Sequence, residues 1–354
     1  RDLLRNPTLQ PVDDVFKQGA DSILALQFIA RAKSLGHAFT LGDVFRNPTT
    51  LGLLKVARTQ AGPAVAGGVN HLHLQPAQGD SSSFKPVSQA QKGIYVQSLR
   101  TRHRTTYVLQ FVFLMVLPDD GVALEEGWRK AHQHHELLRS AFVLAPSGQP
   151  VRVVAEDAPL RWSRTSLVHL HQVQQRQYIK DFLIEDKQSG FELDQPTLYR
   201  LHLFHLGGNN YQFVLSAHHL VLDGASIFSL MSEVFSGLPA APDAFPTYID
   251  GQEKFHLQPQ DQQRWADLLE PFEVPVCVAD KLVEPSLKPV QHQLFERRLP
   301  ATLEQAIVRL CGRAGVTIAS VAATAWAMAL NAVNGGQHQL FGMIVSGRAD
   351  TGVG

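Results

Sequence analysis

The sequence predicts a multidomain protein in which a small all-α unit precedes a larger α/β or α+β unit. Residues 1–60 carry apolar side chains at helical spacing, residues 61–83 are rich in glycine, proline, alanine and serine, and strand and helix patterns alternate from residue 84 onward. A chain of 354 residues is long enough for two or three domains. We therefore expect a helical domain over 1–60 and a linker over 61–83.

The first 60 residues predict three helices. The first is indicated by apolar residues at helical spacing, namely Ile23, Leu24, Leu26, Phe28 and Ile29. Asp21 or Ser22 can cap this helix, and Gly36 is expected to end it. The stretch "TLGDVFRNPTTLGLLKVA" predicts two further short helices, the second opened by Pro48-Thr49-Thr50.

Beyond the linker, the pattern predicts a mixed sheet with covering helices. Strands are expected at 107–117, 151–154, 160–162, 198–206, 210–217 and 339–345. Helices are expected at 89–100, 121–135, 168–182, 226–235, 303–314 and 317–332.

Composition narrows the classes of partner and compartment. The formal net charge is zero, which points to neither nucleic acid nor an anionic membrane as a partner. The two cysteines suit a reducing, cytoplasmic compartment rather than a disulfide scaffold. The chain opens with arginine, so we expect it to be a piece of a longer protein. The uncharged run 316–333 is long enough for a membrane span, but a tightly packed buried helix is the preferred interpretation.

Candidate chemistry gathers in the stretch "SAHHLVLDGASIFSL", where a strand pattern runs into a helix pattern. A metal site over His218, His219 and Asp223 is disfavoured, because adjacent residues of an extended chain point opposite ways and no fourth ligand is near. A structural histidine with a helix-capping aspartate is plausible. An imidazole that accepts or donates a proton near neutral pH is the other plausible interpretation. Spacing alone leaves these last two interpretations open.

Gly224 lies where this helix is expected to begin. A glycine there can adopt a backbone angle that other residues avoid, or can let a ligand approach closely. The amino end of the helix adds free N–H groups and a partial positive charge, and Asp223 or Ser226 can cap it.

The motif His218-His219-Leu220-Val221-Leu222-Asp223-Gly224 resembles the HHxxxDG signature of condensation domains of nonribosomal peptide synthetases. Companion segments resemble other motifs of that family in the same order. These are Ser88, Ala90 and Gln91 of "VSQAQKGIYVQSL", the segment "HHELLRSAF", Tyr248 and Asp250, and a stretch ending at Arg348. Gly93 stands where arginine is usual, and the resemblance runs from about residue 84 to the end.

The resemblance implies a chloramphenicol-acetyltransferase-like fold of two lobes, over 84–245 and 246–354, with the second lobe incomplete. It also implies amide-bond formation, in which the amine of a downstream aminoacyl thioester attacks the carbonyl of an upstream acyl or peptidyl thioester. His219 would then act as general base or would orient the amine, and the Gly224 N–H is a candidate donor to the oxyanion. No metal is expected.

Supporting roles are expected for the residues around this motif from their own chemistry. Asp223 is expected to pair with Arg139 or Arg348 and to hold the loop, while His218 packs inward. Packing is also the preferred role of His134 and His135. Core positions are expected for Tyr95, Trp265 and Trp326.

The segment "VFKQGADSILALQ" resembles the signature of peptidyl carrier proteins, with Ala20 in place of a usual glycine. Ser22 falls where that family carries 4'-phosphopantetheine, although a simple helix cap remains the alternative for this serine. The implied partners are a phosphopantetheinyl transferase, an upstream adenylation domain, a downstream carrier domain, and aminoacyl or peptidyl thioester substrates.

Two other functions stay open. A terminal domain that cyclises the product or forms an ester fits the same motifs, and a non-catalytic module that docks carriers belongs to another class. Epimerisation is less favoured, because Ile227-Phe228 follow "DGAS" where those domains carry Trp-Arg.

Overall fold

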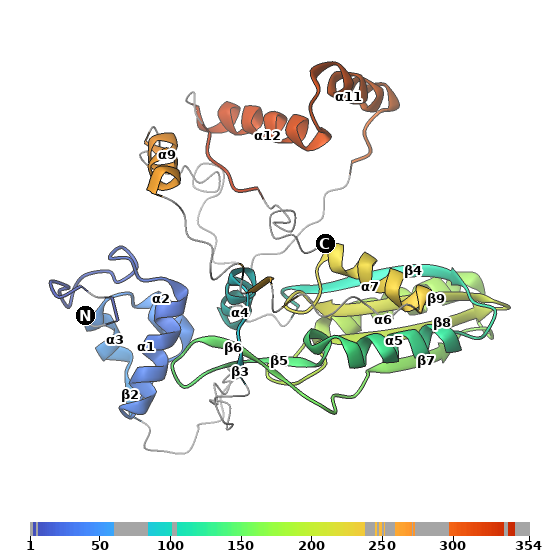
Figure 1. The fold of residues 1–354 in the computed structure, drawn as a ribbon, viewed down its shortest axis with the longest axis horizontal. Coiled ribbons are helices and arrows are strands. Elements are labelled where there is room, and N and C mark those ends of the chain that lie inside the picture. The colour runs from blue at the N-terminus through green and yellow to red at the C-terminus, as the bar shows by residue number, and fades with distance from the viewer. Residues whose placement is uncertain are drawn as a thin grey trace. The chain divides into compact units, whose positions relative to one another are not determined.

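The computed structural model describes residues 3–4, 6–59, 84–100, 105–237, 245, 248–249, 251, 259–270, 272, 297–335 and 339–343. The chain divides into two compact units, residues 1–252 and 253–354 (Figure 1). The predicted linker, residues 61–83, lies outside the described residues, so its boundaries are not tested. They and the predicted lobe boundary at residue 245 stay predictions.

A four-stranded sheet dominates the first unit, in the order β4 (Val108–Val116), β9 (Asn210–His218), β8 (Tyr199–Gly207) and β7 (Trp162–Ser166). The pairs β4–β9 and β9–β8 are antiparallel, whereas β7 and β8 are parallel. The strand pair expected around the turn Gly207-Gly208-Asn209 is therefore present. The strand expected at 160–162 is largely wrong, because β7 begins only at Trp162.

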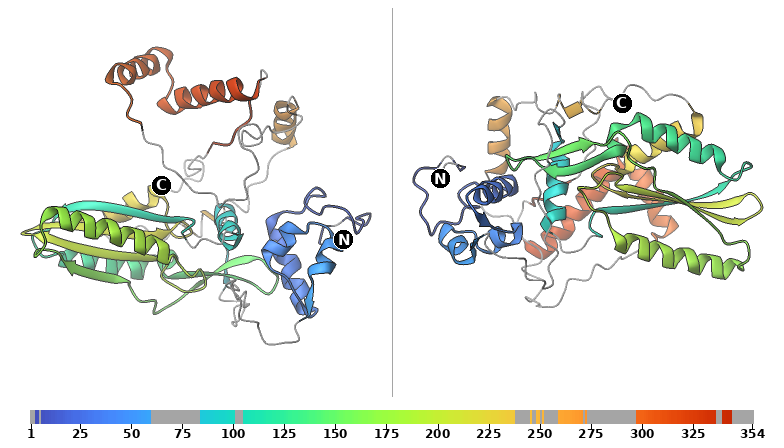
Figure 2. Two further views of the ribbon diagram at one scale, coloured as in Figure 1. Left: turned by 180° about the vertical axis from the view of Figure 1, so that it is seen from behind. Right: turned by 90° about the horizontal axis from the view of Figure 1, so that it is seen from below.

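Helices cover both faces of this sheet (Figures 1 and 2). α5 (Val122–His134) and α7 (Gly224–Ser236) lie on one face, and α6 (Gln172–Ser189) lies on the other. The ring of Trp128 on α5 packs 5.8 Å from that of Tyr199 and 6.1 Å from that of Phe213, centroid to centroid. Because strand residues alternate between faces, Val214 packs instead in a separate cluster with Ile179 of α6.

A smaller sheet of three strands follows the order β3 (Phe84–Lys85), β6 (Pro150–Val154) and β5 (Ser140–Leu144), all antiparallel. The helix predicted at 89–100 is α4 (Gln89–Arg100). Tyr95 on α4 is buried as expected.

The N-terminal segment forms α1 (Ser22–Ser34), α2 (Leu41–Arg46) and α3 (Thr50–Val56), as predicted. It also contains the two-residue strands β1 (His37–Ala38) and β2 (Arg58–Thr59), which the all-α prediction missed. These helices share one apolar cluster with α4, and the guanidinium of Arg100 lies 4.0 Å from the ring centroid of Phe45. The turn after β5 contacts α1, since a Cβ added to Gly148 would lie 2.6 Å from the Cα of Gln27.

The described part of the second unit contains α9 (Pro259–Leu269), α11 (Ala301–Ala314) and α12 (Ile318–Asn334). The helices predicted at 303–314 and 317–332 are present. The strand predicted at 339–345 is wrong for 339–343, which form no strand, and its last two residues lie outside the described ones.

Burial in this unit differs from the prediction. Trp265 and Trp326 are each 55 % exposed, and within α12 only Leu330 is buried. An alanine-rich uncharged helix is buried only where other elements pack against it. In the described part of this unit, α12 contacts α11. In the part of the chain described, no single helix is long and apolar enough to cross a bilayer; α11 and α12 meet that test only as a pair bent by 108°.

Candidate functional site

The site is built on the corner between β9 and α7. His218 is the last residue of β9, and α7 begins at Gly224. The carboxylate of Asp223 caps α7 by accepting a hydrogen bond from the Ser226 N–H at 2.7 Å. The histidine loop, residues 218–223, is thereby held at one end by the strand ladder and at the other by the helix cap.

His218 points inward, with 2 % of its surface exposed. Its Nδ1 accepts a hydrogen bond from the Leu220 N–H at 3.2 Å, which leaves the proton of the neutral ring on Nε2. That nitrogen lies 3.4 Å from the Oγ of Ser98, whose own proton goes to the Ile94 carbonyl. Burial, followed by the neighbouring His219, lowers the pKa of His218 to about 4. His218 is therefore a neutral structural residue at physiological pH.

His219 differs from His218 in its burial and in its hydrogen bonds. Its side chain is only half-buried, and its main-chain N–H donates to the Tyr107 carbonyl at 2.9 Å. The ring of Tyr107 meets the imidazole edge-on, with centroids 6.4 Å apart and planes at 83°. Within the described residues neither ring nitrogen of His219 has a hydrogen-bond partner. Of the two histidines, His219 is the one that can exchange a proton with a bound substrate.

Gly224 does not use the conformational freedom considered from the sequence. Its φ angle is not positive, so another residue could adopt this backbone. However, a Cβ added to Gly224 would meet no atom within 4 Å. The start of α7 is thus open at Gly224, which leaves the N–H of this residue accessible to a ligand.

Gln91 is a site residue whose role the sequence did not predict. Its side-chain Nε2 donates to the Leu220 carbonyl in the histidine loop at 2.8 Å. Its Oε1 accepts from the Ser88 N–H at 3.0 Å, and Ser88 Oγ accepts from the Gln91 N–H at 3.1 Å. This reciprocal capping box carries the recognisable S-x-x-Q spacing, but the long-range bond to Leu220 has no sequence signature.

Arg139, one of the two arginines considered as a partner of Asp223, makes its hydrogen bonds elsewhere. The guanidinium of Arg139 donates instead to the main-chain carbonyls of His132, Gln133 and Ala155, at 3.1, 3.2 and 2.9 Å. Arg139 therefore ties the end of α5 to the segment after β6. The other predicted partner, Arg348, lies outside the described residues, as does Asp250.

The remaining predicted histidines have packing roles. His135 bonds Glu233 of α7 through its Nε2 at 2.8 Å, which links the end of α5 to α7. The ring of His134, at the end of α5, meets that of His135 edge-on at 4.9 Å. In the described part of the chain, no cluster of three histidine, cysteine or acidic side chains could hold a metal ion.

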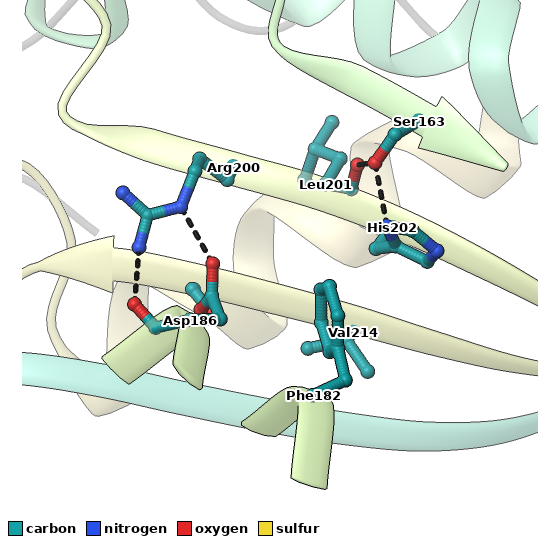
Figure 3. Close-up of a pocket in the computed structure, with 8 residues that line it drawn as sticks. Ser163, Phe182, Asp186, Arg200, Leu201, His202 and Val214 are labelled. Atoms are coloured by element: carbon teal, nitrogen blue, oxygen red, sulfur yellow. Dashed lines mark hydrogen bonds and ion pairs between the residues drawn. The ribbon is translucent and has the colours of Figure 1, made fainter. Parts of the chain in front are cut away.

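A cavity of about 120 Å³ lies between α6 and the sheet (Figure 3). Ser216 lines it, and because strand residues alternate between faces, His218 lies on the same face of β9. Arg200 and Asp186 form an ion pair across it at 2.6 Å, and Ser163 Oγ lies 2.6 Å from His202 Nδ1. Burial lowers the pKa of His202 to about 4, against the opposing charge of Asp186.

One of the polar residues that line this cavity, Arg200, also packs near His218 through Phe191. The guanidinium of Arg200 stacks on Phe191 at 4.1 Å, and the Phe191 ring meets that of His218 edge-on at 6.4 Å. Arg200 is thus linked to the buried histidine through Phe191.

The sequence profile of the condensation domain matches residues 81–353, well over half of the chain. The chain belongs to the condensation domain family. The matched range excludes the helices α1 to α3, so the comparisons do not show a preceding carrier domain.

Relatives of this condensation domain include much longer synthases. It is 27 % identical to a linear gramicidin synthase of Brevibacillus parabrevis over 278 residues, 75 % of this chain and 5 % of the relative. It is 30 % identical to chondramide synthase cmdD of Chondromyces crocatus over 257 residues, 68 % of this chain and 6 % of the relative. The chain thus spans about one twentieth of the relatives it matches.

Solved structures confirm the fold. The first condensation domain of the calcium-dependent antibiotic synthetase, bound to a substrate analogue, superposes with a TM-score of 0.56 at 21 % identity over 72 % of this chain and 61 % of that one. A four-domain nonribosomal peptide synthetase bound to AMP and glycine gives 0.57 at 20 % identity, over 71 % and 20 %. The predicted chloramphenicol-acetyltransferase-like α+β architecture is therefore confirmed for the condensation domain.

Proposed function

We propose that this condensation domain forms an amide bond between two thioester-bound substrates during nonribosomal peptide synthesis. The observation that carries the proposal is the exposed side of His219, whose ring nitrogens have no hydrogen-bond partner in the described residues while His218 is locked inward. In the reaction the amine nitrogen forms the new C–N bond and the C–S bond of the donor thioester breaks. The proton lost by the nitrogen ends on the leaving sulfur.

His219 serves this reaction as the group that accepts a hydrogen bond or a proton from the attacking amine. A general base contributes about 10²–10⁴ in rate, so the step is sensitive to this one side chain. Gly224 begins α7 directly after the histidine loop that carries His219. Its open N–H supplies a donor for the developing oxyanion.

The experiment is a product assay with the complete synthetase, with its flanking carriers loaded with defined thioesters and read by intact mass. A linear, extended thioester on the downstream carrier supports amide formation. A released ring or ester would support the terminal-domain alternative instead, and an unextended donor of inverted configuration would support epimerisation. Binding of both loaded carriers without any turnover would identify a non-catalytic docking module and overturn the proposal.

Two variants test His219 itself. His219→Ala should slow extension by about 10²–10⁴ while the protein keeps its thermal unfolding midpoint. His219→Gln keeps a hydrogen-bond acceptor but cannot take a proton at this site. If the imidazole is a base, the glutamine variant is as slow as the alanine variant; if it orients the amine, glutamine retains part of the rate. Full extension by a folded His219→Ala variant would refute the role of His219.

The N-terminal helices support a second proposal, that residues 1–60 belong to a carrier unit modified at Ser22. Asp21, and not Ser22, caps α1, because its carboxylate accepts from the Leu24 N–H at 2.8 Å. The simple capping role considered for Ser22 therefore does not apply. In the described residues its hydroxyl has no hydrogen-bond partner, and it lies at a helix amino end, which favours a bound phosphodiester.

A phosphopantetheine group on Ser22 would carry an acyl or peptidyl substrate as a thioester and raise its effective concentration near the condensation domain. A phosphopantetheinyl transferase and an adenylation domain are the implied partners, in the cytoplasm. Ser22→Ala should block transfer of the arm, as measured by intact mass after incubation with a transferase and coenzyme A. Ser34→Ala, at the other end of α1, is the matched control and should load normally. A loaded Ser22→Ala variant would refute the site.

A further inference from the structure

Tyr107 has an unusual backbone conformation directly beside the histidine loop. Its φ angle is +62°, in the left-handed region that bulky side chains rarely adopt. It is the last residue before β4, and its half-buried ring faces the residues that follow β9. Strained conformations of this kind persist where the surrounding structure holds them, and they gather at functional sites.

The main chain of Tyr107 extends the β4–β9 ladder by one step. Val108 pairs with His218, and the next bond outward runs from the His219 N–H to the Tyr107 carbonyl at 2.9 Å. This bond fixes the backbone of His219, although that residue already lies beyond the end of β9.

The ring of Tyr107 contacts both imidazoles, at 6.3 Å from His218 and 6.4 Å from His219. In a regular ladder successive side chains alternate between faces, so one ring would follow only one of two adjacent residues. The left-handed backbone of Tyr107 removes it from that alternation. Its ring therefore lies within contact of two side chains that point apart.

The two histidines depend on this ring to different degrees. His218 is already fixed by hydrogen bonds at both ring nitrogens, to the Leu220 N–H and to Ser98 Oγ. The imidazole of His219 has no such bond within the described residues. Among those residues, Tyr107 supplies the one aromatic contact of the His219 ring.

We infer that Tyr107 is a positioning residue for His219, and this inference rests on the proposed amide-forming function. Its carbonyl fixes the main chain of His219, and its ring holds the imidazole in the rotamer that faces the attacking amine. The role belongs to the aromatic ring in its left-handed setting and not to the phenol hydroxyl, which has no partner in the described residues.

Three substitutions separate the role of the ring from that of the hydroxyl while keeping the left-handed backbone. Tyr107→Phe keeps the ring and should extend the peptide at a rate within about twofold of the wild type, since only the hydroxyl is lost. Tyr107→Asn and Tyr107→Gly both tolerate the left-handed backbone but lack the ring. They should lower kcat about 10²-fold, the effect of a misplaced catalytic group, with KM for the acceptor carrier little changed.

A double-mutant cycle in the full synthetase distinguishes positioning from a general structural effect. If Tyr107 acts through His219, adding Tyr107→Asn to His219→Ala should not slow the residual reaction further. Additive losses would show that Tyr107 acts independently of His219 and would overturn the inference.

A second readout needs no turnover. Diethyl pyrocarbonate should modify His219 several-fold faster in the asparagine and glycine variants than in wild type or Tyr107→Phe, measured on the peptide that contains His219. Wild-type kcat and unchanged labelling in both ringless variants would refute the inference.

The alanine variant of His219 distinguishes failure of this inference from failure of the proposed function. If His219→Ala is itself fully active, the proposed function fails. If His219→Ala is slow while Tyr107→Asn is not, only the role of Tyr107 fails.

Discussion

The side-chain amide of Gln91 on α4 donates to the main-chain carbonyl of Leu220, 129 residues away, at 2.8 Å. The Oε1 atom of the same side chain accepts a hydrogen bond from the Ser88 N–H. One carboxamide thus caps α4 and holds the middle of the histidine loop. Both bonds are buried, so the loss of either one leaves a polar group without compensation from water.

Gln91→Glu separates these two bonds. A glutamate still accepts from the Ser88 N–H, because S-x-x-E is an equally good capping box, but its carboxylate cannot donate to Leu220. The variant should lose about 1–3 kcal/mol of unfolding free energy in urea at pH 8, together with most of its condensation rate. Ala90→Glu adds the same charge at an exposed neighbouring position and is the control. Equal urea midpoints for Gln91→Glu and wild type would contradict the role of this bond.

Asp223 gives a second prediction, on the cap of α7. Asp223→Ala removes the oxygen that accepts from the Ser226 N–H and should cost about 1 kcal/mol of unfolding free energy. Asp223→Asn keeps an oxygen that accepts from the Ser226 N–H while removing the charge, so it should be less destabilising than Asp223→Ala. Chemical denaturation of both variants provides the measurement. If the two substitutions are equally destabilising, the charge of Asp223 matters and the cap does not.

Much of the fold follows from patterns that short stretches of sequence carry. α4 begins and ends at the predicted residues, and β8 and β9 each lie within one residue of their predicted bounds. β7 was misplaced because its residues, among them Ser163 and Arg164, are polar and exposed on an edge strand. An edge strand with no buried alternation has no periodic signal.

The candidate site also has features that the sequence predicts and features that it does not. The opposite orientations of His218 and His219 follow from strand alternation, and the cap at Asp223 follows from its place before a helix. Arg139 could not be assigned, because main-chain carbonyl acceptors leave no trace in the sequence. Nor does any local pattern announce a left-handed tyrosine such as Tyr107, whose conformation is imposed by the neighbouring strand and loop.

Two helical glycines predict opposite effects of the same substitution. A Cβ on Gly127 of α5 would overlap the main-chain carbonyl oxygen of Val234, so Gly127→Ala should push α5 and α7 apart and cost about 1–3 kcal/mol. A Cβ on Gly93 of α4 meets no atom within 4 Å, so Gly93→Ala should stabilise by roughly 0.5–1 kcal/mol. Thermal unfolding midpoints should move in opposite directions. A stabilised Gly127→Ala variant would mean that α5 and α7 are not in contact at this point.

The buried imidazoles predict a loss of stability in weak acid. Burial lowers the pKa of His218 and of His202 to about 4, and it also lowers the pKa of His132. Between about 6.5, the value in an unfolded chain, and about 4, the unfolded state binds more protons than the folded state. The free energy of unfolding therefore decreases as the pH falls through this range.

For His218, which is almost fully buried, the displacement corresponds to roughly 3 kcal/mol between neutral pH and pH 4. His218→Asn can still accept from the Leu220 N–H, but it has no group that titrates in this range. It should be less stable than wild type at pH 7.5, and its urea midpoint should fall less steeply toward pH 4. Parallel curves for the two proteins would mean that His218 is not held neutral by burial. The measured difference in slope therefore reports directly on whether the inward histidine stays uncharged behind the one that faces the substrates.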